Sequence, residues 1–165
     1  MKYSLEMNIE LIKKIKKENL KIVFTNGCFD ILHVGHIRYL QSAKELGDFL
    51  VIGLNSDSSV KINKGKNRPL NIFKDRAKML SSLKAVDLVI NFEEQTPLKL
   101  IKNILPDILV KGGDYKIEAI VGSEDVIKNG GKVISLDFYE GYPTLYGKIK
   151  INNIMKHKLM KKHLF

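Results

Sequence analysis

Two histidines, His33 and His36, stand three positions apart in the segment TNGCFDILHVGH, which covers residues 25–36. A helix is expected to begin here, and residues three apart share one face of a helix. The open backbone amides at a helix start attract an anion. Gly27 permits a sharp turn close to a ligand, and Gly35 leaves room beside the imidazoles. The pattern therefore predicts a phosphate site at which both imidazoles donate hydrogen bonds.

Two simpler interpretations of these histidines stay open. A histidine near a helix start can be a capping or surface residue, and two histidines three apart can form half of a zinc site. Zinc requires further Cys, His or carboxylate ligands. Cys28 and Asp30 are near in sequence. The loop would have to fold back to present them, so we expect no metal site built by the protein.

Five apolar runs alternate with helical patterns along the chain. The runs lack strict alternation of polar and apolar residues, which is typical of strands covered on both faces; they are residues 21–26, 49–54, 87–92, 107–114 and 132–138. Apolar residues at helical spacing predict helices over 5–18, 35–46, 72–83, 97–104 and 123–128. This order predicts an α/β fold, a doubly wound five-stranded parallel sheet of Rossmann-like type with right-handed crossovers.

Individual residues predict several boundaries of these elements. Gly47 is expected to end the helix 35–46 at its C′ position. Thr96 and Pro97 form an N-cap and N1 pair for the helix that follows. The polar stretch 55–71 predicts a loop.

The crevice of a doubly wound sheet lies beyond the carboxyl ends of its strands. This rule selects three segments, 26–36, 55–68 and 111–115, each of which follows a predicted strand. We therefore expect the ligand to lie among them.

The run from Gly27 to His36 has the pattern GxFDxxHxGH, so the chain resembles the cytidylyltransferase-like nucleotidyltransferases. Within that family it is most similar to the D-glycero-β-D-manno-heptose 1-phosphate adenylyltransferases in their stand-alone form, over about residues 20–141. The matching motifs are Asn55-Ser56-Asp57, Lys64-Gly65, Arg68-Pro69, Arg76, Glu94-x-Thr96-Pro97, Pro106-Asp107, Lys111-Gly112-Gly113-Asp114-Tyr115, Val121-Gly122 and Asn129-Gly130-Gly131.

The resemblance implies in-line attack of a sugar 1-phosphate on the α-phosphorus of ATP, with Mg²⁺ carried on the triphosphate. It implies catalytic roles for His33, His36, Lys64 and Arg76. Nucleotide binding is expected from both histidines and from Thr25, Asn26, Gly27, Cys28, Phe29, Gly35, Gly112, Gly113, Asp114 and Thr144. The expected substrate-binding residues are Asp30, Asn55, Asp57, Lys61 and Arg68.

Some of these residues also fit plainer roles. Asp30 is expected to hold its loop together without touching substrate. Arg76 could instead pair with Asp75 or Glu94. Any one of the lysines near residue 64 could be a bystander, because several stand together there.

Charge is concentrated at the C-terminus of this 165-residue chain of net charge +10. Residues 145–165 hold six lysines and no acidic residue, whereas the remainder is nearly balanced, with 22 basic and 18 acidic residues. We therefore divide the chain into an N-terminal amphipathic helix (1–20), a nucleotidyltransferase domain (21–144) and a basic C-terminal helix or tail (145–165). A solvated tail explains this charge more simply than a nucleic-acid partner does.

Other bulk features indicate the cellular setting. No apolar run is long enough to span a bilayer, and a single cysteine suits a reducing compartment. We expect a cytoplasmic enzyme whose partners are small molecules, an NTP and a sugar phosphate. The apolar face of the N-terminal helix could pack within the chain or across a homodimer.

The C-terminal end departs from the family pattern. Family members follow the last strand with a glycine and a Ser-Thr-Thr run, whereas this chain has Gly141-Tyr142-Pro143-Thr144-Leu145-Tyr146-Gly147. Three explanations stay open: a loss of activity, replacement of the lost phosphate contacts by the lysines, and an altered reading frame. Two other functions also stay open, a cytidylyltransferase acting on a glycerol or alcohol phosphate and a non-catalytic nucleotide- or RNA-binding module.

Overall fold

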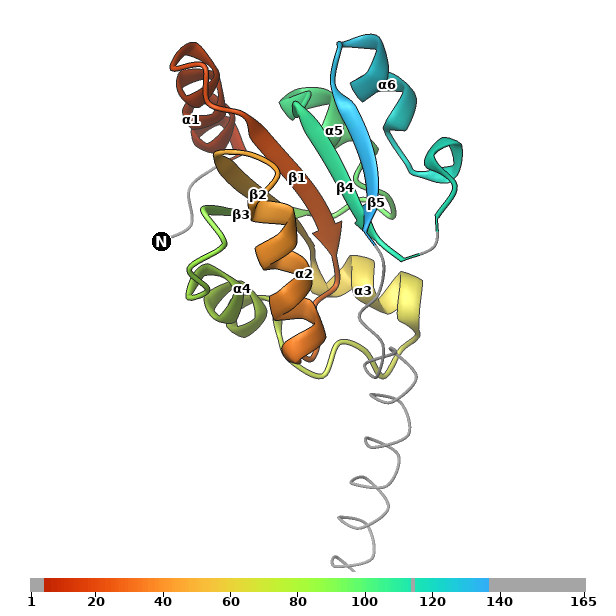
Figure 1. Ribbon diagram of the computed structural model, residues 1–165. Helices are drawn as coiled ribbons and strands as arrows, with labels where there is room; N and C mark the ends of the chain where they lie inside the picture. The colour runs from red at the N-terminus through yellow and green to blue at the C-terminus, as the bar shows by residue number, and fades with distance from the viewer. Residues whose placement is uncertain (1–4, 114, 137–165) are drawn as a thin grey trace, which may run out of the picture.

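A five-stranded parallel sheet forms the centre of the protein in a computed structural model that describes residues 5–113 and 115–136. The strands are β1 (Ile22–Gly27), β2 (Phe49–Asn55), β3 (Leu88–Phe92), β4 (Ile108–Gly112) and β5 (Lys132–Leu136). Their spatial order is β3-β2-β1-β4-β5, and every neighbouring pair is parallel (Figure 1). The predicted doubly wound fold is confirmed. Asp114, Thr144 and the basic tail lie outside the described residues.

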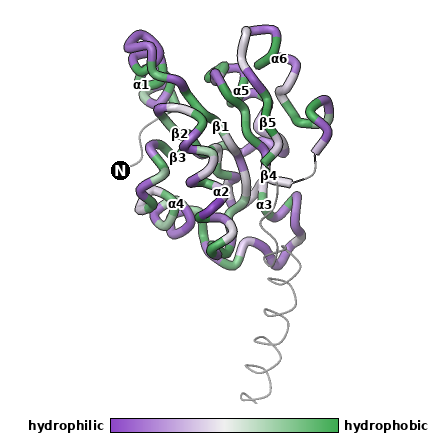
Figure 2. Tube along the Cα trace, in the orientation of Figure 1, coloured by the Kyte–Doolittle hydropathy of each residue, from purple (hydrophilic) through white to green (hydrophobic). Residues whose placement is uncertain are grey.

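Helices connect the strands and cover both faces of the sheet (Figure 1). They are α1 (Leu5–Lys17), α2 (Val34–Lys44), α3 (Asp57–Lys64), α4 (Phe73–Ser81), α5 (Leu98–Ile104), the 3₁₀ turn η1 (Ile117–Ala119) and α6 (Ser123–Lys128). The backbone trace of α1 alternates between hydrophilic and hydrophobic residues, as expected for a helix with one face in the core (Figure 2). None of the helices in the described ranges is long and apolar enough to cross a membrane.

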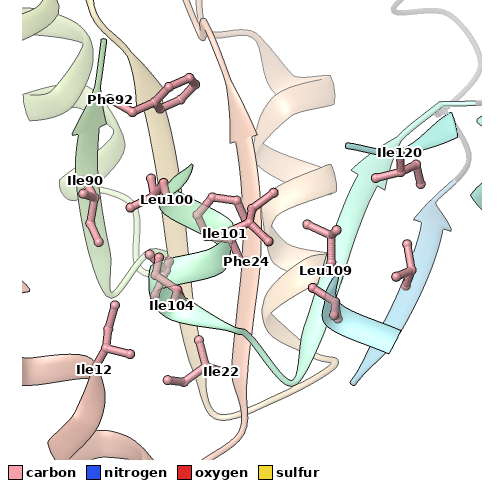
Figure 3. Close-up of a cluster of buried hydrophobic side chains, with 13 residues drawn as sticks. Ile12, Ile22, Phe24, Ile90, Phe92, Leu100, Ile101, Ile104, Leu109 and Ile120 are labelled. Atoms are coloured by element: carbon pink, nitrogen blue, oxygen red, sulfur yellow. The ribbon is translucent and has the colours of Figure 1, made fainter. Parts of the chain in front are cut away.

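Two hydrophobic clusters lie on opposite faces of the sheet. Because side chains alternate along a strand, Ile22 and Phe24 of β1 enter one cluster and Val23 enters the other. The first cluster joins the sheet to α1, α5 and α6 (Figure 3). The second joins it to α2 and α4, through Leu40 and Leu80 among others.

Strand pairing is uneven across the sheet. β1 pairs with β2 through six residues, from Ile22 to Gly27, but with β4 through only Val23 and Phe24. The pairing between β1 and β4 therefore ends before the carboxyl ends of these two strands. The order in which strands are added to the sheet also reverses at β1. β2 and β3 lie on one side of β1, and β4 and β5 lie on the other. Ligand crevices of doubly wound folds form at this point.

The polar stretch 55–71 was predicted to be a loop, and this prediction is wrong over α3. Ser56 caps that helix by accepting a hydrogen bond from the Ser59 backbone N–H at 3.1 Å. Val60 is the only apolar residue of α3 that is buried. A helix with so small an apolar face has little hydrophobic periodicity, so the sequence pattern did not reveal it.

Two predicted helix boundaries also differ. α2 ends at Lys44 with Glu45 as its C-cap, and Gly47 does not take a left-handed conformation. A Cβ atom on Gly47 would instead lie 2.7 Å from Val23 Cγ2 and 2.9 Å from the Lys21 carbonyl oxygen. Pro97 rather than Thr96 occupies the N-cap position of α5, and its side chain makes no capping bond.

We expect Gly47→Ala to lower the free energy of unfolding by about 1–3 kcal/mol, because the added methyl would overpack the turn against β1. Chemical denaturation measures this. Glu45→Ala is the matched control on the exposed side of the same turn, with an expected change within about 0.5 kcal/mol. Equal stability of the two variants would show that the turn relaxes around a methyl group.

Candidate functional site

The three segments predicted to line a ligand crevice come together at the carboxyl ends of β1, β2 and β4. Lys111 Nζ of β4 donates a hydrogen bond to Asn26 Oδ1 of β1 at 3.2 Å. Arg76 of α4 bonds the carbonyl oxygens of Cys28 and Asn55, beyond β1 and at the end of β2. These contacts place the loop from Gly27 to His36 in the middle of the site.

His33 and His36 form a stacked pair at the start of α2. His33 is the N-cap residue, and its carbonyl oxygen accepts the His36 backbone N–H at 2.9 Å. The imidazole centroids are 3.9 Å apart with planes tilted by 33°. The ring of Phe29 meets that of His36 edge-on at 5.4 Å. The pair is thus brought together as the sequence predicted, beside open amides of a helix start.

Phe29 is held in an unusual backbone conformation. Its φ is 42°, in the left-handed region that a bulky residue rarely adopts, and its side chain is buried. A Cβ atom on Gly27 would lie 3.0 Å from the Phe29 ring. Gly27 therefore lets the Phe29 ring fold back over the end of β1 and support His36.

Burial keeps both imidazoles neutral at pH 7. It lowers the pKa of His36 to about 4, helped by the nearby His33, and it lowers the pKa of His33 as well. Nδ1 of His36 is buried and has no hydrogen-bond partner among the residues that the structure describes. A buried N–H without an acceptor is rarer than an unused lone pair, so Nε2 is the expected donor. Within 5–113 and 115–136, no three His, Cys, Asp or Glu side chains converge as a metal site.

Asp30 fastens the loop after β1 to the segment before α4. Its Oδ2 accepts a hydrogen bond from Arg68 Nη1 at 2.5 Å, and its Oδ1 accepts the backbone N–H groups of Leu70 and Asn71 at 2.8 and 3.0 Å. The carboxylate thus pairs with Arg68 and holds two backbone N–H groups. This geometry supports the loop-holding role for Asp30, and its assignment with Arg68 to substrate binding stays a prediction.

Arg76 is fully buried, with its guanidinium surrounded by protein acceptors. Nη1 donates to the Cys28 carbonyl at 2.6 Å and Nη2 donates to the Asn55 carbonyl at 2.9 Å. Nη2 also pairs with Asp57 Oδ1 at 2.7 Å, and Nε donates to the Asn71 carbonyl at 2.9 Å. Among the described residues its carboxylate partner is therefore Asp57, and not Asp75 or Glu94. Four bonds to protein leave little of the fork for a phosphate.

The residues after β2 divide between the interior and the surface. Asn55 is buried, and its Nδ2 donates to Ser59 Oγ at 2.9 Å, inside α3. Lys61 and Lys64 are exposed on α3. Lys64 lies near enough to Cys28 to lower the pKa of its thiol, although burial raises that pKa overall. The charge of Lys64 thus reaches the loop after β1, and the predicted roles of Lys61 and Lys64 both stay predictions.

A tyrosine that the sequence analysis did not select bridges β1 and β4. Tyr39 of α2 shares a 2.7 Å hydrogen bond with the hydroxyl of Thr25, which is fully buried. A Cβ atom on Gly112 would lie 3.0 Å from the Tyr39 ring. Gly113, with φ 111°, donates its N–H to the Leu136 carbonyl at 2.8 Å. In this structure Thr25 and Gly112 thus both contact Tyr39, and their nucleotide-binding roles stay predictions.

We expect Arg76→Met to lower the free energy of unfolding by about 3–5 kcal/mol, because it leaves Asp57 and three carbonyl groups without their donor. Arg76→Lys should lose less, since it keeps the charge but cannot form the planar fork. Urea denaturation measures both. Lys74→Met, an exposed change on the same helix, is the control and should stay within about 0.5 kcal/mol. A stable Arg76→Met protein would contradict this assignment.

Several curated relatives of the chain share one name. The chain is 60% identical over 137 residues to the bifunctional protein HldE of a Nitratiruptor species, and 49% identical over 156 residues to that of Helicobacter hepaticus. These alignments cover 82% and 93% of this chain. They cover only 29% and 31% of the relatives, so the chain spans less than a third of their length.

A solved structure and a family match agree with these relatives. The crystal structure of the lipopolysaccharide core biosynthesis protein from Thermoplasma volcanium is 33% identical, with a TM-score of 0.60, and the match covers 75% of this chain and 99% of that one. Residues 24–146 match the family described as Cytidylyltransferase-like. This match spans the histidine pair and most of the sheet, and the chain therefore belongs to the cytidylyltransferase-like family of nucleotidyltransferases.

Proposed function

We propose that the chain transfers AMP from ATP to D-glycero-β-D-manno-heptose 1-phosphate, giving an ADP-sugar and pyrophosphate. The observation that carries this proposal is the neutral imidazole pair His33–His36, stacked at 3.9 Å where the strand order reverses. The motif Lys111-Gly112-Gly113-Asp114-Tyr115 and the lipopolysaccharide-related neighbour favour the heptose branch. The stand-alone form stays a prediction, because the HldE relatives are bifunctional and longer than this chain. The cytoplasmic location and the homodimer also stay predictions.

The acceptor phosphate needs no general base from the protein. A phosphate monoester is mostly dianionic at pH 7, because its second pKa is about 6. The obstacle is repulsion between two polyanions. Two unit charges about 4 Å apart repel by about 4 kcal/mol at an effective dielectric of about 20, which is a factor of about a thousand in rate. Cations and oriented donors at the crevice are therefore the parts that the reaction requires.

The described residues provide both kinds of group. The neutral imidazoles of His33 and His36 donate N–H hydrogen bonds to the α- and β-phosphates, where charge builds as pyrophosphate leaves. Lys64 approaches from α3 with a positive charge. Arg76 positions the backbone of Cys28 and Asn55 and does not itself touch the phosphates.

Mg²⁺ enters this proposal as part of the substrate, MgATP. Mg²⁺ commonly keeps several waters and binds through substrate phosphates with few protein ligands. The described part of the chain has no cluster of three or more His, Cys, Asp or Glu that could hold the ion. We propose that the triphosphate and its waters supply most of the ligands of the ion.

A panel of nucleotides and acceptors tests the function. ATP, CTP, GTP and UTP are each combined with heptose 1-phosphate, glucose 1-phosphate, glycerol 3-phosphate and phosphocholine, and pyrophosphate release is measured. The proposal expects the highest kcat/KM for ATP with heptose 1-phosphate. Preference for CTP with an alcohol phosphate would support the cytidylyltransferase alternative. Absence of pyrophosphate in every combination, with tight RNA binding that weakens steeply with salt, would support a binding module.

Replacing either histidine tests its role in the reaction. We expect His33→Asn and His36→Asn each to lower kcat by about 10²–10³-fold, as for loss of one preorganised donor. The assay is pyrophosphate release from ATP and heptose 1-phosphate. Val34→Ala, an exposed change in the same helical turn, should keep kcat near that of the wild type. A loss below about tenfold, or about 1.4 kcal/mol, would remove the histidines from direct contact with the reacting groups.

The lowered pKa of His36 also predicts a pH-dependent stability. Its pKa falls from 6.5 to about 4 on folding. Between these values the unfolded chain binds a proton that the folded chain does not, so the free energy of unfolding decreases as the pH falls through this window and levels off below it. His36 accounts for a loss of up to about 3 kcal/mol in the free energy of unfolding across this window.

His36→Asn should remove this contribution, so its stability should fall less steeply between about pH 6.5 and 4 than that of the wild type. Urea denaturation at a series of pH values measures the difference. His33→Asn serves as the comparison, with a smaller expected change because that ring is more exposed. Parallel curves for the wild type and His36→Asn would contradict the burial of a neutral imidazole.

A further inference from the structure

The left-handed backbone of Phe29 connects the loop after β1 to the histidine pair. Its φ of 42° costs a residue with a side chain about 1–2 kcal/mol, and such a conformation persists only where the surrounding structure imposes it. The Phe29 ring is buried and meets the His36 imidazole edge-on at 5.4 Å. The contacts that fix the backbone at Phe29 therefore also fix the support of His36.

The two carbonyl groups on either side of Phe29 both accept hydrogen bonds from the segment that leads into α4. Arg76 Nη1 donates to the Cys28 carbonyl at 2.6 Å. Asn71 Nδ2 donates to the Asp30 carbonyl at 2.5 Å. The two donors are themselves joined, because Arg76 Nε donates to the Asn71 carbonyl at 2.9 Å. The backbone is thus held before and after Phe29 by one connected group of side chains.

Asn71, which is half-buried, binds Asp30 through both its backbone and its side chain. Its backbone N–H donates to Asp30 Oδ1 at 3.0 Å, and every residue type except proline could form this bond. The bond from Nδ2 to the Asp30 carbonyl requires a side-chain donor. A substitution at this position therefore removes one bond and leaves the backbone bonds to Asp30 and Arg76 in place.

A local role in the turn is the alternative for this amide. Asn side chains in turns commonly bond the backbone of their own neighbours. The acceptor here lies 41 positions away, in the loop after β1, and not in the turn before α4. The amide of Asn71 therefore acts on the loop that leads to the histidines.

We infer that Asn71 is a positioning residue for the His36 imidazole. Its side-chain amide holds the Asp30 carbonyl and so keeps Phe29 left-handed, with the ring against His36. Asn71 acts through Phe29 and not by contact with substrate. The geometric part of this inference stands on the contacts alone, whereas its effect on rate rests on the proposed function. A displacement of about 1 Å can cost about 10²-fold in rate.

Nuclear magnetic resonance of the full chain tests the geometry without any need for activity. The chain has four histidines, so four ring Cε1–Hε1 signals are expected, and the signal that is lost in His36→Asn belongs to His36. Asn71→Ala is compared with Asn63→Ala as the matched control, because Asn63 Nδ2 also donates to a carbonyl, that of Gln95 at 3.2 Å. Thermal melting checks that each variant is folded.

We expect Asn71→Ala to shift the His36 signal, because the Phe29 ring no longer meets the imidazole at the same angle. Asn63→Ala should leave this signal in place. Asn71→Ser, whose hydroxyl is too short to reach the Asp30 carbonyl, should act like the alanine variant and replaces it if that protein does not fold. A wild-type His36 signal in a folded Asn71 variant, or an equal shift in Asn63→Ala, overturns the inference.

Kinetics test the consequence for the reaction, with pyrophosphate release from ATP and heptose 1-phosphate as the assay. Asn71→Ala should lower kcat by at least about tenfold and change KM by less than about threefold. Asn63→Ala should keep wild-type values. In the His36→Asn background, Asn71→Ala should change kcat by less than about threefold, because the group that it positions is gone. An equal loss in both backgrounds, or no loss in either, overturns the inference.

The two tests separate this inference from the proposed function. If the wild type releases no pyrophosphate, the heptose reaction is rejected and the His36 signal alone decides the role of Asn71. If the wild type releases pyrophosphate but neither the signal nor kcat responds to Asn71→Ala, the reaction stands and the positioning role is rejected.

Discussion

The buried guanidinium of Arg76 fixes the geometry on which the rest of the site depends. It bonds the carbonyl of Cys28 beyond β1, the carbonyl of Asn55 at the end of β2 and the carboxylate of Asp57 in α3. Carbonyl groups at strand ends lack partners in the sheet, and burying them without donors is costly. The Arg76 side chain thus supplies hydrogen-bond donors to three segments. The loop that carries the histidines cannot shift without breaking these bonds.

Charge is distributed around this framework in a way that suits anionic substrates. Burial lowers the pKa values of both imidazoles, and His36 packs edge-on against Phe29, so the two neutral rings can lie 3.9 Å apart without mutual repulsion. Lys64 of α3 and Lys111 of β4 add positive charge near the same loop, since both act on the thiol of Cys28. Positive charge and neutral donors therefore border one crevice, which suits polyanionic substrates.

How much the sequence could predict depends on how far apart the interacting residues lie in the chain. The histidine pair and the strand pattern are local features, and both were predicted. α3 was missed because it buries one apolar side chain, and a pattern of hydrophobicity has little to detect there. The contact of Lys111 with Asn26 spans 85 positions, and that of Arg76 with Asp57 spans 19. These contacts depend on which strands lie side by side in the sheet, and a local sequence motif does not specify that order.

The weak pairing of β1 with β4 has a mechanical consequence. β1 and β2 are joined by six residue pairs, β2 and β3 by five, and β4 and β5 by five, whereas two join the halves of the sheet. The two halves of the sheet are therefore joined by little backbone pairing, and the Tyr39 hydroxyl links them by bonding Thr25 of β1 at 2.7 Å and the Val110 carbonyl of β4 at 3.4 Å. A ligand that contacts both halves of the sheet would add contacts that the backbone pairing lacks, so ligand binding would make the enzyme more rigid.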